Sequence, residues 1–322
     1  MILDFDAFVT AAAFDREGRA VFALGDGTVR FDNGVTHQAH DGAVLSAAHA
    51  PGGRGVLTGG DDGRAVITTL EGVSEIAAIP GRWIDAVAAS DASGLVAFAA
   101  GRELHVRDPA DAAFQRLFRH DKSVADIDFD AKGRRIAVAT YGGAWLWYAR
   151  IAEQKPARLD WAGSHVGVRW SPDGKFLVSA MQENQLHGWR VADEKNMRMG
   201  GYPAKVKSLA FMAKGSMLAT SGANGAVVWP FAGATGPMGK QAAEIGWDES
   251  ALVARIAARP DGSWLAAGLD DGRVWACDVT GERLVHLKAD KGPPITALAI
   301  SPDGARVAWG DEAGGAGVGA VS

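Results

Sequence analysis

Residues 171–180 read SPDGKFLVSA, and residues 301–310 read SPDGARVAWG. Both stretches begin with the same four letters, a polar turn around a glycine, and both continue into an apolar run. A catalytic loop has no reason to occur twice, whereas a structural unit that cannot fold alone is repeated along its chain. The duplication therefore predicts a fold built from copies of one short unit.

Eight copies of this phrase cover the chain when they are aligned on their glycine. The shortest spacing, from Gly18 to Gly53, is 35 residues, and the longest, from Gly215 to Gly262, is 47 residues. The glycines of the copies are Gly18, Gly53, Gly94, Gly133, Gly174, Gly215, Gly262 and Gly304. A period near 40 residues is typical of β-propeller blades.

Each copy has the same order of short apolar runs and polar turns. In the fifth copy VGVRW (166–170) precedes the turn and KFLVSA (175–180) follows it. Second turns such as DDG (61–63) and ANG (223–225) are typical of tight hairpins, because glycine accepts a positive φ. Runs of four to seven residues without a helical period predict an all-β fold. The tryptophans of the third runs are expected in the core: Trp145, Trp147, Trp189, Trp229 and Trp275.

A fourth, weaker run lies between consecutive copies, which gives four strands per sheet. The last copy lacks this run, while a spare run, ILDFDAF (2–8), precedes the first copy. We therefore predict a single domain over residues 1–322, a closed β-propeller of eight four-stranded antiparallel blades whose N-terminal strand completes the last blade. Seven blades are the alternative, because the last run, GAGVGAVS (315–322), is rich in glycine, which weakens strands.

The composition limits the partners and the compartment. The formal net charge is −5, which disfavours binding to phosphate backbones. Cys277 has no second cysteine with which to form a disulfide or a metal cluster. No apolar stretch approaches about 18 residues, and the start MILDFDAFVT lacks the basic region of a signal peptide. We expect a cytoplasmic protein that binds neither nucleic acid nor membrane and carries no cofactor or metal.

Parts of a histidine-based pattern recur in the copies. His40 precedes the first run of the second copy, with Thr58 in its second run and Asp62 in the next turn. His120 precedes the first run of the fourth copy, with Thr140 in its second run.

Together with the period, these residues resemble the WD-repeat (tryptophan-aspartate repeat) β-propeller family, and the resemblance extends over essentially the whole chain. In that family a histidine, a serine or threonine, an acidic residue and a tryptophan form a hydrogen-bonded set within a blade. The positions to which the resemblance assigns this structural role are His40, Thr58, Asp62, His120, Thr140, Ser179, Glu183, Trp189 and Asp271. The second copy departs from the pattern with Thr68 in place of the tryptophan, and the seventh has Cys277 and Asp278 in place of Trp-Asp. The family implies a rigid platform that binds other proteins, without catalysis.

No residue pattern signals catalysis, so we predict no catalytic residue and no enzyme. The eight histidines include no pair at the spacing of a metal site. Cys277, close to Trp275 in an apolar run, is expected to be buried rather than nucleophilic. The G-x-G-x-G pattern at 315–319 has no helix after it to direct an N-terminus at phosphate.

The second turns and the loops between copies are expected to share one face, which is the candidate protein-binding surface. Cations with aromatic neighbours favour an acidic peptide, since arginine, tryptophan and tyrosine dominate interface hot spots. The candidate residues are Arg82, Trp83, Lys122, Tyr141, His165, Gln182, Lys205, Asp270 and Lys291. On the opposite face, PFAGATGPMGKQ (230–241) and ADEKNMRM (192–199) are expected to be loops that could grip a partner.

The leading hypothesis is a non-enzymatic scaffold or adaptor that binds protein or peptide partners, acidic ones at the cationic face, as a monomer or as a subunit of a larger assembly. The alternative is a propeller enzyme or small-molecule binder, of hydrolase or lactonase type, that uses the mouth of the central channel.

Overall fold

The repeated phrase forms a hydrogen-bonded turn between consecutive strands. The Ser171 hydroxyl accepts a hydrogen bond from the backbone N–H of Phe176 (2.9 Å) and donates one to Asp173 (2.7 Å). Asp173 in turn accepts the backbone N–H of Lys175 (3.1 Å). Gly174 has a φ of 69°, which glycine adopts without strain. The phrase is therefore a device for reversing the chain.

The same chemistry appears in other copies. Ser301 accepts the N–H of Arg306 and donates to Asp303. Asp15 and Asp130 take the place of the serine in the first and fourth copies, and their carboxylates accept the backbone N–H four residues further along. Recurrence of the turn explains why the phrase is repeated.

The computed structural model describes residues 1–259 and 261–321. Pro260, in the turn of the seventh copy, and Ser322, at the end of the predicted domain, lie outside the described residues. Two short 3₁₀ helices, η1 (Pro51–Gly53) and η2 (Ala213–Gly215), accompany the strands. Within the described part, no helix is both long enough and apolar enough to span a membrane.

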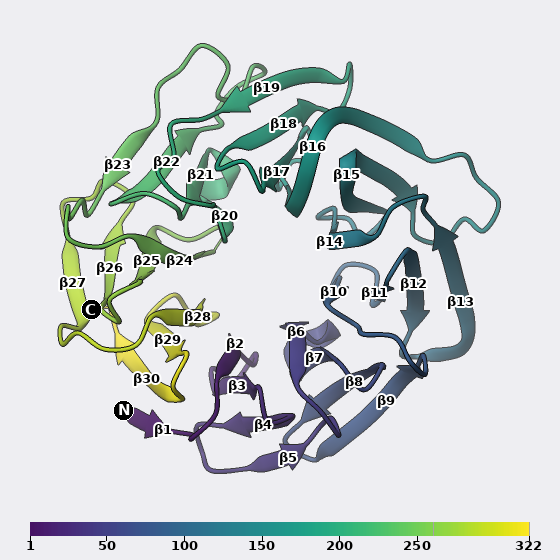
Figure 1. Ribbon diagram of the computed structural model, residues 1–322, viewed down its shortest axis with the longest axis horizontal. Helices are drawn as coiled ribbons and strands as arrows, with labels where there is room; N and C mark the ends of the chain where they lie inside the picture. The colour runs from purple at the N-terminus through teal and green to yellow at the C-terminus, as the bar shows by residue number, and fades with distance from the viewer. Residues whose placement is uncertain (260, 322) are drawn as a thin grey trace. The chain divides into compact units, whose positions relative to one another are not determined.

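Within the described residues the strands form seven antiparallel sheets, six of them with four strands each (Figure 1). One sheet contains β2 (Val9–Phe14), β3 (Ala20–Leu24), β4 (Thr28–Phe31) and β5 (Thr36–Gln38). The next contains β6 (Val44–His49), β7 (Gly55–Gly60), β8 (Arg64–Thr69) and β9 (Gly72–Ala78). A third contains β10 (Ala86–Ala89), β11 (Val96–Ala100), β12 (Glu103–Asp108) and β13 (Asp111–Arg119). A fourth contains β20 (Leu209–Met212), β21 (Met217–Thr220), β22 (Ala226–Pro230) and β23 (Ala243–Ile245). A fifth contains β24 (Val253–Ala258), β25 (Trp264–Leu269), β26 (Val274–Asp278) and β27 (Leu284–Lys288). The last of the six contains β28 (Ile295–Ile300), β29 (Arg306–Asp311), β30 (Gly315–Ala320) and β1 (Ile2–Asp4).

The seventh sheet contains six strands and corrects the predicted number of blades. Its strands are β14 (Val124–Phe129), β15 (Arg135–Tyr148), β16 (Ala157–Trp170), β17 (Phe176–Met181), β18 (Leu186–Arg190) and β19 (Lys195–Met199). β15 and β16 have 14 residues each and cover positions at which the sequence pattern has two short runs. β15 turns back on itself, because the backbone N–H of Ala149 donates to the carbonyl of Arg134 (2.8 Å). The fourth and fifth copies therefore share one sheet. The prediction of eight blades is wrong, and seven, the alternative, is the number of sheets in the described residues.

A glycine step accompanies the long pairing of β15 with β16. The register shifts between Tyr141 and Gly143, and a Cβ at Gly143 would lie 2.1 Å from the carbonyl oxygen of Leu159. A residue with a side chain would separate the two strands at this point. The segment 192–199, expected to be a loop, ends in strand β19.

The N-terminal strand joins the last sheet, as predicted. β1 pairs antiparallel with the glycine-rich β30, with Ile2 opposite Gly317 and Asp4 opposite Gly315 (Figure 1). The charged N-terminus of Met1 also donates a hydrogen bond to the carbonyl of Val318 (2.8 Å). The predictions of four-stranded antiparallel sheets and of the completing N-terminal strand are confirmed, while closure into a ring stays a prediction.

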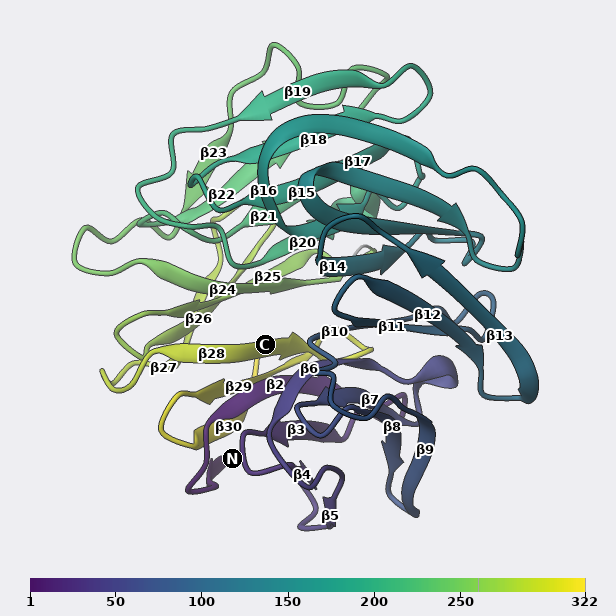
Figure 2. The same cartoon turned by 45° about the vertical axis from the view of Figure 1, so that its right-hand side comes forward.

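The chain divides into two compact units. One contains residues 13–170, and the other contains residues 1–12 and 171–322. The N-terminal residues are thus counted with the C-terminal half, next to β28, β29 and β30 (Figure 2). The prediction of one domain over residues 1–322 stays a prediction.

Apolar side chains between neighbouring sheets form the core of each unit. In the unit of residues 13–170, Leu104 from one sheet and Ile136 and Trp147 from the next belong to one buried cluster. In the other unit, Leu218 is buried, and Trp275 packs into a cluster with Val228 of the preceding sheet. Burial of such a side chain stabilises the fold by about 1.5–3 kcal/mol.

The tryptophan prediction is confirmed for three of its five residues. Trp147, Trp189 and Trp275 are buried. Trp145 and Trp229 are only partly buried.

Acidic side chains of β14 bind the end of β16 within the unit of residues 13–170. Asp126 accepts hydrogen bonds from the N–H of Val168 (2.9 Å) and from Arg169 (2.8 Å), and Asp128 accepts the N–H of Trp170 (2.8 Å). Burial, reinforced by neighbouring negative charges, raises the pKa of Asp128 to about 7 against the opposing effect of the Arg169 charge.

This raised pKa predicts a pH-dependent stability. An unfolded aspartate has a pKa of about 3.9, so the folded protein retains the Asp128 proton to higher pH than the unfolded chain. The resulting stabilisation is complete below about pH 4 and is lost as the pH rises to about 7. We expect Asp128→Asn, which remains neutral, to be more stable than the wild type, by about 2 kcal/mol more at pH 8 than at pH 5. Urea unfolding at the two pH values measures this difference; an equal difference at both would contradict the raised pKa.

Candidate functional site

The histidine pattern of the second copy is assembled into a buried hydrogen-bonded set. One ring nitrogen of His40, Nδ1, lies 3.0 Å from the Asp62 carboxylate, and the other, Nε2, lies 2.9 Å from the Thr58 hydroxyl. His40 and Thr58 are fully buried. The three residues come from the loop before β6, from β7 and from the turn after β7, so the set ties one loop to its sheet.

Asp62 also orders the backbone around this set. Its carboxylate accepts the N–H groups of Arg64 (3.0 Å) and Asp41 (3.1 Å). Burial by itself would raise the pKa of Asp62, but the hydrogen bonds from Arg64, His40 and Asp41 outweigh it and lower the pKa. Asp62 is therefore held as a carboxylate that accepts bonds, with no role as an acid.

Among the described residues, His120 bonds to the tryptophan of its own copy, Trp147, and not to Thr140. Its Nε2 accepts the indole N–H of Trp147 (3.0 Å), and its Nδ1 lies 3.2 Å from the Arg102 carbonyl oxygen. Burial lowers the pKa of His120, which keeps the ring neutral and able to accept. The Thr140 hydroxyl is directed at backbone carbonyls of its own turn, that of Gly143 among them (3.4 Å).

The remaining positions that the resemblance assigned lie in the fifth and seventh copies. Ser179 donates to the carbonyl of His187 (3.2 Å), and the His187 ring packs edge-on against buried Trp189. Glu183 is exposed in the turn after β17. Asp271 forms ion pairs with Arg273 (2.8 Å) and, more loosely, Lys291 (3.3 Å).

Four candidate binding residues in the unit of residues 13–170 lie on loops or turns that are tied to neighbouring turns: Arg82, Trp83, Lys122 and Tyr141. The loop that carries Trp83 is tied to the turn after β7, because Ile79 and Ile84 donate to the carbonyls of Gly63 (2.8 Å) and Gly60 (3.0 Å). Trp83 is 67% exposed.

Arg82 approaches the turn at residues 101–102, Arg102 belongs to this turn, and the loop that carries Lys122 is tied to it. A Cβ at Gly101 would lie 3.5 Å from the guanidinium of Arg82. The loop that carries Lys122 is fixed to the same turn, because Val124 donates to the carbonyl of Gly101 (2.8 Å). Arg102, in the turn itself, is exposed and was not among the sequence candidates. Its position in a second turn is the signal that could have found it.

Tyr141 belongs to the same region, whereas His165 does not. Thr140 pairs with Val124, which places Tyr141, 62% exposed, next to the loop of Lys122. His165 was expected on the surface, and this expectation is wrong. It lies inside β16, it is 1% exposed, and its ring bonds the carbonyl of Trp161 (3.0 Å), because the strand continues through the segment where a loop was predicted.

The candidates in the other unit are largely engaged with their own neighbours. Lys205 donates to the side-chain oxygen of Gln182 (2.5 Å). The Asp270 carboxylate accepts the N–H of Leu252 (2.9 Å). Lys291 is paired with Asp271 as described above. These contacts leave less charge available to a partner than the sequence suggests.

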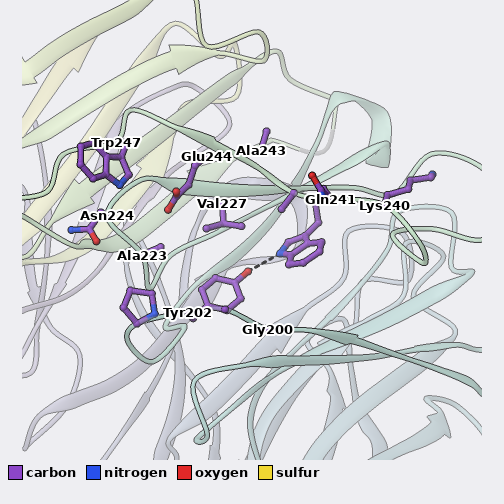
Figure 3. A pocket seen from close by; sticks show the side chains of 14 residues that line it. Gly200, Tyr202, Ala223, Asn224, Val227, Lys240, Gln241, Ala243, Glu244 and Trp247 are labelled. Atoms are coloured by element: carbon purple, nitrogen blue, oxygen red, sulfur yellow. Dashed lines mark hydrogen bonds between the residues drawn. The ribbon is translucent and has the colours of Figure 1, made fainter.

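Sequence reasoning missed a hollow beside β22 and β23, in the unit of residues 1–12 and 171–322. Its volume is about 460 Å³, and its lining includes Tyr202, Trp229, Lys240, Glu244 and Trp247 (Figure 3). Trp247 lies outside the third strands and within the polar segment WDES (247–250), which is the sequence signal of an exposed tryptophan.

Few features of this arrangement favour catalysis. Among residues 1–259 and 261–321, no group of three or more His, Cys, Asp or Glu side chains is placed to hold a metal ion. Cys277 is fully buried, and burial, with the nearby Asp278 charge, raises the pKa of its thiol to about 12.

Comparison with known proteins agrees with this architecture. The family described as "WD domain, G-beta repeat" matches residues 33–67, the segment that contains His40, Thr58 and Asp62. No curated protein matches the sequence.

Two solved structures are similar to the chain. The computationally designed Ika8 protein has a TM-score of 0.79 and 18% sequence identity, over 98% of this chain and 97% of that one. The β-propeller domain of Cps50 (Swd1) from Myceliophteria thermophila has a TM-score of 0.69 and 15% identity, over 87% of this chain and 96% of that one. At these identities the likeness shows the fold alone, which is a β-propeller. The chain has the β-propeller fold, and its residues 33–67 match a WD-repeat model, in agreement with the resemblance to that family. Its repeats support a protein-interaction scaffold in general terms.

The buried set around His40 predicts a stability difference between two threonines of one sheet. Thr58→Val removes the partner of a buried ring nitrogen and is expected to cost about 1–3 kcal/mol in urea unfolding. Thr68 is equally buried, but its hydroxyl has no hydrogen-bond partner in the described residues. The matched control Thr68→Val should therefore be neutral or stabilising. Equal losses in both variants would show that the His40 bond contributes nothing.

The raised pKa of Cys277 predicts an inert thiol. The native protein should not react with a thiol-specific disulfide reagent at pH 8, whereas protein unfolded in urea should release one equivalent of chromophore. Rapid stoichiometric reaction of the native protein would contradict the burial of this side chain.

Proposed function

We propose that this protein is a non-enzymatic scaffold that binds an acidic segment of a partner protein at the surface formed by Arg82, Trp83, Lys122 and Tyr141. The observation that carries the proposal is the exposure of two large aromatic side chains, Trp83 at 67% and Tyr141 at 62%, next to unpaired cations of the same unit. Aromatic side chains beside arginine are the usual composition of interface hot spots.

The loops that carry these residues are ordered before any partner binds. Backbone hydrogen bonds from Ile79, Ile84 and Val124 fix them to turns of the sheets. A partner therefore has to immobilise only side chains, which reduces the entropy cost of association.

Charge favours an acidic partner at this surface. Arg82, Arg102 and Lys122 form no ion pair among the described residues. Glu103, which follows Arg102 in the chain, is already paired with Arg119 (3.0 Å). The Arg119 hydrogen bond lowers the pKa of Glu103, and the charge of Arg82 contributes to the same effect.

The proposal also includes the compartment, the kind of partner and the oligomeric state. A cytoplasmic location, an acidic partner, and action as a monomer or as a subunit of an assembly are what the composition and the repeats favour. The enzyme or small-molecule binder stays the alternative prediction, without a particular group of side chains in its favour.

Reversal of charge at this surface should abolish partner capture. We expect Arg82→Glu combined with Lys122→Glu to reduce capture from an extract of the source cell by at least about tenfold, measured by affinity purification with quantitative mass spectrometry. Lys132→Glu combined with Arg134→Glu is the matched control, because these exposed cations lie in the turn at the other end of β14. Partners lost equally from both variants, or from neither, would remove this surface as the site.

A further inference from the structure

A second exposed tryptophan lies in the unit of residues 1–12 and 171–322. Trp247 is 59% exposed and follows the short edge strand β23. A ring of this size exposes much apolar surface to water, and such surface on a rigid loop is typical of interaction sites.

The loop that carries Trp247 is rigidly held. The side-chain amide of Asn224 donates to the carbonyls of Asp248 (3.2 Å) and Ala251 (2.9 Å), and the N–H of Asp248 donates back to the Asn224 carbonyl (3.1 Å). Asp248 also accepts two hydrogen bonds from Ser250, at 2.7 and 2.9 Å.

The backbone of Trp247 also rests on a glycine. A Cβ at Gly225 would lie 3.3 Å from the Cα of Trp247 and 2.9 Å from the carbonyl oxygen of Ile245. The backbone that carries the indole is therefore held before any ligand arrives, so a ligand has to order only the side chain.

Hollows lie on both sides of this ring. The hollow beside β22 and β23 has a volume of about 460 Å³, and a second one, lined by Trp275, Leu284 and His286, has about 430 Å³. Trp247 lines both. In Figure 3 the carboxylate of Glu244 lies between Trp247 and Val227, with Tyr202 further along the first hollow.

The described residues that line the first hollow include one carboxylate, Glu244, and one cation, Lys240. Glu244 is exposed, and within the described part of the chain it has no ion pair and no side-chain hydrogen bond. The Lys240 ammonium donates to the carbonyl of Ala232 (2.8 Å). In the second hollow, Arg273 is committed to Asp248 (2.7 Å) and Asp271 (2.8 Å).

The Tyr202 hydroxyl, which also lines the first hollow, is already hydrogen-bonded within the protein. It accepts the indole N–H of Trp229 (2.7 Å) and is bonded to Thr220 (2.7 Å). Burial raises its pKa to about 12, so it stays neutral. The wall formed by Tyr202 and Trp229 is therefore aromatic and uncharged, and Glu244 provides the only carboxylate among the described residues that line this hollow.

We propose that this surface, defined by Trp247, Glu244, Tyr202 and Trp229, binds a basic segment of a partner protein. An arginine or lysine side chain of the partner stacks on the exposed indole, where the ring quadrupole attracts its cation, and its charged group pairs with Glu244. The hydrocarbon part of such a side chain covers the apolar wall of the hollow. This site is separate from the cationic surface around Trp83 and has the opposite charge preference.

A short basic peptide tests the proposal. The probe is the fluorescein-labelled, amidated heptapeptide GRGRGRG, and the readout is fluorescence polarisation at low and at physiological salt. We expect the wild type to bind it and Trp247→Ala and Glu244→Gln each to weaken binding by about fivefold or more. Citrulline is neutral. A heptapeptide with citrulline in place of arginine should bind the wild type at least as weakly as the arginine peptide binds these two variants.

Matched variants separate this site from general electrostatics. Glu312→Gln removes one exposed carboxylate elsewhere in the same unit, and Trp83→Ala removes an equally exposed indole from the cationic surface. Both should bind the peptide within twofold of the wild type, as should the Arg82→Glu, Lys122→Glu variant. No binding by the wild type, equal losses in Glu312→Gln, or tight binding of the citrulline peptide would each overturn the proposal. Unchanged thermal midpoints of the variants show that they are folded.

Discussion

The whole structure depends on the need to cover both faces of each small sheet. The second strands β7, β11 and β17 are buried along their entire length, while the outer strands β9 and β13 contain one buried residue between them. A four-stranded sheet with strands of four to seven residues cannot exclude water from two faces alone, so its neighbour in the chain must supply the cover. This requirement explains why one phrase is repeated with little change and why its turn chemistry is kept.

Hydrogen bonds of polar side chains then fix the loops to this frame. His40 with Thr58 and Asp62 ties a loop to the second sheet, and Asn224 does the same for the loop of Trp247. A buried polar group is costly without a partner, so each set specifies one loop conformation. Rigid loops on a covered frame are a suitable base for recognition, because little ordering remains to be done on binding.

The two surfaces that follow from this arrangement differ in charge. Arg82 and Lys122 lie near exposed Trp83 in one unit, whereas exposed Trp247 lies near Glu244 in the other. In our two proposals, the first surface selects an acidic partner segment and the second selects a basic one. A scaffold with two such sites can hold two different segments at once, which a single charged face cannot do.

The sequence by itself determined the strand positions, the turns and the residues that meet within one sheet, because these follow from contacts a few residues apart. Thr58 and Asp62, 18 and 22 residues from His40, were assigned to it through the resemblance to the WD-repeat family. Only the tertiary structure decided that the fourth and fifth copies share one sheet, that His165 is buried in β16, and that Trp247 stands exposed between two hollows. Each of these depends on how a strand continues or how neighbouring sheets pack, and such long-range packing leaves no local pattern in the chain.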